Sequence, residues 1–176
     1  MAKRLTVLLA VMAALMGGLL AHRAAAATAV VTSDVKFVNG LLLAAGVECD
    51  PETYYVCGIG EFDGQAAVTR VEYPTNQRLL LDEGCALYDT VEVVTLLDGS
   101  GELVLQHLDA KVCGPNPNWL LHATDRSFGN PFRVTSTWTV DGGAGVYAGA
   151  PGSGDGAVRW AGGAGSGGHT GTITTP

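Results

Sequence analysis

An alternation of apolar and polar residues with a period of two recurs along most of the chain. Residues 132–140 (FRVTSTWTV) place Phe, Val, Ser, Trp and Val on one face and Arg and Thr on the other, and residues 65–73 alternate similarly. This period is typical of half-buried β-strands, whose successive side chains point to opposite faces of a sheet. Further strands or apolar stretches are predicted at residues 28–38, 41–47, 53–62, 84–97, 102–112 and 119–124.

Turn signals separate these stretches. Asp63-Gly64 and the run Asp98-Gly99-Ser100-Gly101 favour tight hairpin turns. No window of 11 residues beyond the N-terminal segment carries a helical stripe. Short strands with turns between them predict an all-β fold, either a sandwich or a barrel, and the period alone does not choose between them.

The C-terminal third is rich in glycine. Between the glycines of residues 142–171 lie short apolar groups, Val146-Tyr147 and Val158-Arg159-Trp160. Two interpretations remain open, a flexible tail or short strands between tight turns. We expect a strand at residues 152–160 and leave residues 162–176 as either a strand or a tail.

The first 26 residues have the layout of a secretory signal. Lys3 and Arg4 precede an uncharged apolar run at residues 5–20, and small residues at 24–27 offer cleavage sites. No later apolar run is long enough to span a bilayer as a helix. We therefore expect a secreted or otherwise extracytoplasmic protein without a stable membrane span.

Four cysteines indicate two disulfides, because their number is even in a chain expected to be exported. The hairpin of residues 84–97 and 102–112, with its turn at 98–101, places Cys85 opposite Cys113. The remaining pair, Cys49 and Cys57, flanks a turn. A zinc site is disfavoured because no CxxC spacing occurs.

Charge excludes one class of partner. The chain has 17 acidic and 10 basic residues, a net charge of −7, which becomes more negative when Lys3, Arg4 and Arg23 leave with the signal. A nucleic-acid-binding protein needs a basic face. With 47% hydrophobic and 15% charged residues, the chain is also unlike an acidic disordered segment.

Residues 142–150 (GGAGVYAGA) are similar to a glycine signature, GGTGxFxGAxG, of allene oxide cyclase-like and dirigent-like barrels. Ala144 stands where that family has Thr, and Pro151 interrupts the run. The resemblance implies eight antiparallel strands around an apolar cavity, and the cyclisation or radical coupling of small hydrophobic molecules. It assigns no catalytic residue here. We expect residues 27–161 to form a disulfide-stapled antiparallel barrel of about eight strands.

Candidate catalytic residues lie in the stapled hairpin. A uniform register pairs His107 with Val91 and Asp109 with Asp89, so that Asp89, Asp109 and His107 share one face. If this face points inward, burial and like charge raise the pKa of one carboxyl, as acid–base catalysis requires. A slip by one residue would separate the aspartates.

Other catalytic motifs are missing from the sequence. Ser153 and Ser166 lie between glycines but lack the GxSxG context of a serine hydrolase. The histidines show no HxxxH or HExxH spacing. We therefore expect neither a bound metal nor a cofactor.

The sequence thus predicts an exported barrel that binds a small apolar molecule or guides its cyclisation. The alternative is a filled barrel that serves as a non-enzymatic envelope or extracellular interaction module. A mixture of large and small residues on the predicted inner faces favours a cavity, which we expect to open near the turn at residues 142–149. These inner residues are Trp138, Tyr88 and Leu105, and Ala67, Ala86, Ala110 and Ser136.

Overall fold

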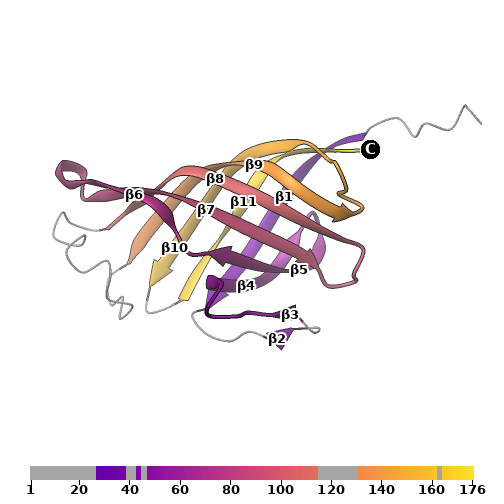
Figure 1. Cartoon of the computed structure of the whole chain (residues 1–176), viewed down its shortest axis with the longest axis horizontal. Coiled ribbons are helices and arrows are strands. Elements are labelled where there is room, and N and C mark those ends of the chain that lie inside the picture. The colour runs from indigo at the N-terminus through magenta and orange to yellow at the C-terminus, as the bar shows by residue number, and fades with distance from the viewer. Residues whose placement is uncertain (1–26, 39–42, 45–46, 115–130, 162–163) are drawn as a thin grey trace, which may run out of the picture.

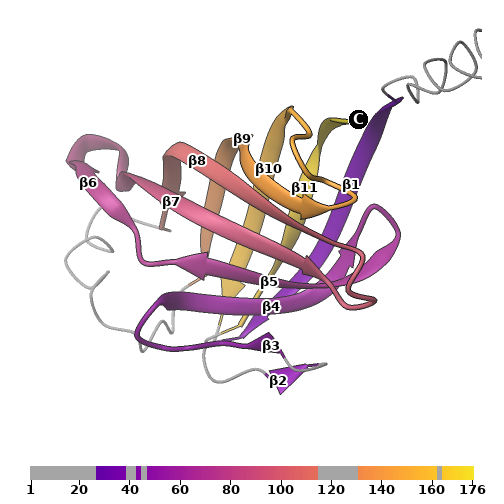
Figure 2. The same ribbon diagram turned by 45° about the vertical axis from the view of Figure 1, so that its right-hand side comes forward.

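Long antiparallel strands make up the computed structural model, which describes residues 27–38, 43–44, 47–114, 131–161 and 164–176. Eight of them form the closed ring of a nine-stranded sheet: β1 (Ala27–Val38), β4 (Tyr54–Phe62), β5 (Gln65–Glu72), β7 (Cys85–Leu96), β8 (Gly101–Cys113), β9 (Phe132–Gly145), β10 (Gly152–Ala161) and β11 (Ala164–Thr175). The order is β5-β4-β1-β11-β10-β9-β8-β7, and β7 also pairs with β5 (Figures 1 and 2). The sheet is therefore closed, and the expected barrel of about eight strands is confirmed.

Shorter elements lie outside this ring. They are β2 (Leu43–Ala44), β3 (Val47–Glu48), β6 (Thr75–Leu80) and a 3₁₀ turn, η1 (Leu81–Glu83). The sequence did not predict β6, which pairs with the first half of β7 while β5 pairs with the second half. Pro74 separates β5 from β6, because proline has no N–H to continue the ladder.

Two expectations lie outside the described residues, the signal at 1–26 and the strand at 119–124. Among the described residues no helix has the length and apolar character needed to cross a membrane.

Tight turns and disulfides hold the strands as the sequence predicts. Asp63 and Gly64 have φ of 52° and 72°, the left-handed conformation that a two-residue hairpin turn requires. Disulfides join Cys85 to Cys113 across β7 and β8, and Cys49 to Cys57. Both expected pairings are confirmed.

Glycines of β10 and β11 make room for two tryptophan rings. A Cβ atom on Gly154 or Gly171 would lie 2.6 or 2.4 Å from Cζ2 of Trp138, and one on Gly165 would lie 2.7 Å from Cε2 of Trp160. Since real Cβ atoms do not approach so closely, larger residues would displace the rings. The glycine-rich Ala164–Thr175 segment is a strand between β1 and β10, not a tail.

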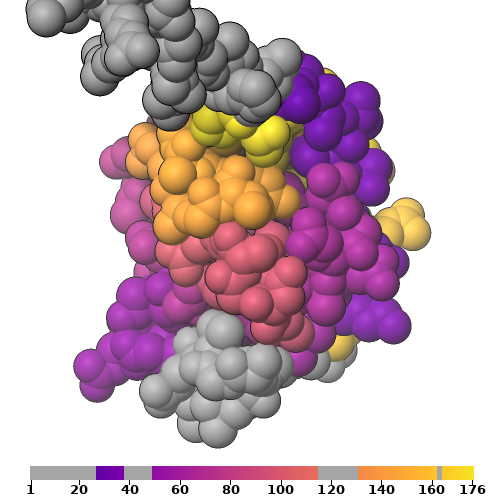
Figure 3. Space-filling model, turned by 90° about the vertical axis from the view of Figure 1, so that its right-hand side faces the viewer, coloured from indigo at the N-terminus to yellow at the C-terminus, as the bar shows by residue number. Residues whose placement is uncertain are grey.

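One half of the barrel interior is filled by side chains. Figure 3 looks onto this end, where the β4–β5, β7–β8 and β9–β10 turns lie side by side. Tyr147, from the glycine signature, packs here edge-on against Phe62 at 6.2 Å. The buried cluster comprises Val31, Phe62, Ala67, Val94, Leu96, Leu103, Leu105, Trp138, Tyr147, Ala150 and Ile173. The expectation of a cavity entrance near residues 142–149 is therefore wrong, because these residues pack over the filled end.

Candidate functional site

A pocket of about 410 Å³ occupies the other half of the barrel. Its volume lies within the range of about 300–1,000 Å³ that is typical of small-molecule sites. The small inner residues predicted from the sequence leave this space: Ala86, Ala110 and Ser136 all line it. Most other lining residues are apolar, including Val56, Val71, Val112, Val134 and Val158.

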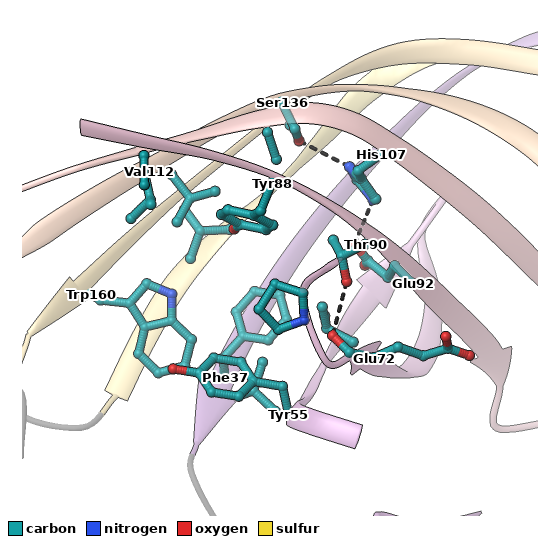
Figure 4. A pocket seen from close by; sticks show the side chains of 18 of the residues that line it. Phe37, Tyr55, Glu72, Tyr88, Thr90, Glu92, His107, Val112, Ser136 and Trp160 are labelled. Carbon is teal, nitrogen blue, oxygen red and sulfur yellow. Dashed lines mark hydrogen bonds and ion pairs between the residues drawn. The ribbon is translucent and has the colours of Figure 1, made fainter. Parts of the chain in front are cut away.

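Aromatic rings form one wall of the pocket. Phe132 stacks on Trp160 with ring centroids 5.9 Å apart, and Phe37 lies 6.0 Å from the same indole. Figure 4 shows Tyr55 beside Phe37 and Tyr88 above them. Burial raises the pKa of Tyr88, so its hydroxyl stays protonated and can donate a hydrogen bond to a bound molecule.

Three buried titratable residues from three strands form the polar base of the pocket. His107 on β8 and His169 on β11 each place Nε2 3.1 Å from Oε2 of Glu92 on β7. Their side chains are 4%, 3% and 5% exposed, respectively. The indole of Trp138, part of the filled half, meets the ring of His169 edge-on. The Glu92–His107–His169 cluster thus lies between the packed core and the open pocket.

Two serines contact the far side of the imidazole rings. Oγ of Ser136 on β9 lies 3.0 Å from Nδ1 of His107 (Figure 4). Oγ of Ser33 on β1 lies 2.9 Å from Nδ1 of His169 and also accepts the backbone N–H of His169 at 2.7 Å. Both ring nitrogens of each histidine are therefore engaged, which fixes the orientation of the rings.

Opposing effects set the charges in the cluster. Burial by itself would raise the pKa of Glu92, but the charge of His169 and hydrogen bonds from both imidazoles hold it well below its ordinary value. Burial would lower the pKa of His169, but the Glu92 carboxylate raises it above its ordinary value. The pocket therefore ends on an ionised carboxylate, a kind of perturbed group that is enriched at functional sites.

Of the three candidate residues from the sequence, only His107 lies in the pocket. Asp109 is exposed, has a φ of 53° and forms an ion pair with Arg78. The Asp89 carboxylate accepts hydrogen bonds from Nδ2 of Asn76 and the backbone N–H of Asp109, 2.8 and 2.9 Å away. The two aspartates thus contact each other and residues of β6, and neither contacts His107.

A β-bulge explains this difference. The expected register holds from Cys85–Cys113 to Tyr88–Ala110, and then shifts so that His107 pairs with Thr90 instead of Val91. An extra residue in one strand changes which side chains face inward. The register expected from the sequence was therefore wrong beyond the bulge.

The shift brings Glu92 onto the same face as His107, whereas a uniform register places them on opposite faces. One signal in the sequence marks this bulge, because the inward-facing apolar residues of β8 change from odd to even positions. Leu103 and Leu105 face inward before the bulge, and Ala110 and Val112 face inward after it. His169 was missed because it stands among glycines, with no local spacing that connects it to Glu92 or His107.

Comparisons of the chain with protein-family models, curated proteins and solved structures found no match.

Proposed function

We propose that the barrel binds a small, largely apolar molecule in this pocket and guides its rearrangement, such as a cyclisation. One observation carries the proposal: a pocket of about 410 Å³ with apolar walls ends on the buried Glu92–His107–His169 cluster. Apolar walls gain free energy by covering the body of a ligand, and a few polar groups fix its orientation. The ligand would therefore carry one polar end, directed at the cluster.

The architecture and the chemistry of the cysteines support this proposal. An eight-stranded barrel is wide enough to hold one small ligand, and it is the fold implied by the resemblance of residues 142–150 to allene oxide cyclase-like and dirigent-like proteins. Two disulfides favour an oxidising compartment, in keeping with the export that we expect from residues 1–26.

Titration with 1-aminoanthracene, a small neutral fluorophore, tests the binding step. We expect one binding site per chain and a rise in the melting temperature with dye concentration. Ala110→Leu places a larger side chain in the pocket and should weaken binding at least tenfold. Ala66→Leu is the matched control, because Ala66 is exposed on β5 and does not line the pocket.

Unfolding must not be mistaken for loss of binding. Ala110→Leu fills empty space, so its melting temperature without dye should stay close to that of the unmodified protein. Equal dye affinity in the unmodified protein and Ala110→Leu would refute the proposed binding site. The alternative, an interaction module without a ligand, would then be favoured.

A further inference from the structure

Going beyond the proposed function, we propose that Glu92, His107 and His169 bind one divalent transition-metal ion at the base of the pocket. Each residue contributes one donor atom: Nε2 from each histidine and a carboxylate oxygen from the glutamate. The ion's remaining coordination positions would face the pocket, because all three residues line it.

The three donor atoms come together at the base of the pocket. All three lie within 4.8 Å of one another, and both imidazole-to-carboxylate distances are 3.1 Å. Zinc binds nitrogen and oxygen at about 2.0–2.2 Å, so two neighbouring ligands of one tetrahedral or octahedral ion lie roughly 2.8–3.6 Å apart. The two distances that involve Glu92 fall in this interval, and the two Nε2 atoms lie within 4.8 Å of each other.

The serines supply the outer contacts that a metal-binding histidine needs. A metal-ligating imidazole usually donates its other N–H to an oxygen, which sets the tautomer and orients the ring. Oγ of Ser136 and Oγ of Ser33 are placed to accept Nδ1–H from His107 and His169 at 3.0 and 2.9 Å. An ion would displace the Nε2 protons that hydrogen-bond to Glu92, and the Nε2 lone pairs would then point toward it.

The carboxylate provides an independent observation. Oε1 of Glu92 is buried and has no hydrogen-bond partner among the described residues, whereas Oε2 faces both imidazoles. A buried carboxylate oxygen without a partner is costly, and a cation that binds the carboxylate would compensate its charge. An ion that binds Oε1 would give this oxygen the partner that it lacks.

The donor set selects the class of ion. Mg²⁺ and Ca²⁺ prefer oxygen ligands, whereas two imidazoles with one carboxylate suit Zn²⁺ or Fe²⁺ and leave positions open for a substrate. An ion held here would polarise an oxygen atom on the polar end of a bound molecule.

Metal binding is tested on the purified, oxidised protein after treatment with a chelator. We expect isothermal titration with Zn²⁺ to give one ion per chain, and Co²⁺ to give visible absorption bands from nitrogen and oxygen ligands. Glu92→Gln and His107→Gln should each weaken Zn²⁺ binding at least a hundredfold. Ser136→Ala leaves all three ligands in place and should weaken it about 10–100-fold.

Glu72→Gln is the matched control for Glu92→Gln. It removes a carboxylate from a residue that lines the same pocket but lies outside the cluster, so Zn²⁺ affinity should be unchanged. Circular dichroism and melting temperature without metal show whether each variant is folded. If Glu92→Gln does not fold, Ser136→Ala and the Co²⁺ spectrum decide the question.

Two results would overturn the inference. One is Zn²⁺ binding no tighter in the unmodified protein than in folded Glu92→Gln, and the other is a Co²⁺ spectrum unaffected by His107→Gln. Failure here is distinguishable from failure of the proposed function: dye binding without Zn²⁺ binding refutes only the metal site. Zn²⁺ binding without dye binding refutes only the apolar ligand.

Discussion

Replacing a disulfide by two alanines should destabilise the barrel more for Cys85–Cys113 than for Cys49–Cys57. The first disulfide joins residues 28 positions apart, and the second joins residues 8 positions apart. A cross-link that restricts the unfolded chain contributes about 3.6 kcal/mol for the longer loop and about 2.5 kcal/mol for the shorter one. The free energies of unfolding of the two double variants should therefore differ by about 1 kcal/mol.

The burial of the cysteine side chains predicts the opposite order of stability for the two double variants. Comparing their free energies of unfolding therefore distinguishes the two explanations. Cys57 and Cys49 are 0% and 4% exposed, whereas Cys113 is only half-buried. If lost packing dominated, the Cys49/Cys57 double variant would be the less stable one.

Equilibrium unfolding in urea measures both variants against the oxidised, unmodified protein. Loss of the longer cross-link should also raise the dependence of the unfolding free energy on urea, because the unfolded chain becomes more expanded. An equal or greater loss of stability in the Cys49/Cys57 variant would show that restriction of the unfolded chain does not set the order.

Two further predictions concern the packing of a glycine strand and the titration of a buried tyrosine. Gly171→Ala brings a methyl group against the Trp138 indole and should cost about 1–3 kcal/mol in urea unfolding; Gly142→Ala, whose new atom would meet only Val104 at 3.8 Å, should have little effect. Because burial raises the pKa of Tyr88, the unfolded chain releases the phenolic proton first, so stability should fall as pH rises above about 10. Tyr88→Phe should flatten that fall.

Each of these predictions has an outcome that would contradict it. Equal stabilities of Gly171→Ala and Gly142→Ala would mean that the indole is not confined by the glycine strands. If the free energy of unfolding of Tyr88→Phe falls as steeply at alkaline pH as that of the unmodified protein, other groups cause this loss of stability.

Local patterns were sufficient to predict most of the fold. The alternation in residues 132–140, the Asp63-Gly64 turn and the Cys85–Cys113 pairing each depend on neighbouring residues or on one hairpin, and each is confirmed. The sequence does not decide between a strand and a tail for β11, because the stability of this strand comes from two partner strands and from the ring of Trp138.

The site was less predictable than the fold. His107 was correctly selected as a candidate, but the bulge at Asp109 removed its expected aspartate partners and brought Glu92 into reach. His169 comes from a strand that meets β7 and β8 only across the closed barrel. Such contacts depend on the closure of the barrel and on the register of its strands, and the spacing of neighbouring residues in the sequence predicts neither.

Methyl-resolved NMR during a titration with 1-aminoanthracene tests pocket binding most directly. The methyl groups of Ala110 and Val112 line the pocket, whereas those of Leu103 and Ile173 lie in the filled half. Binding in the pocket predicts saturable shifts of the Ala110 and Val112 signals, with those of Leu103 and Ile173 nearly unchanged. Saturable binding that shifts Leu103 and Ile173 but leaves Ala110 and Val112 in place would contradict it.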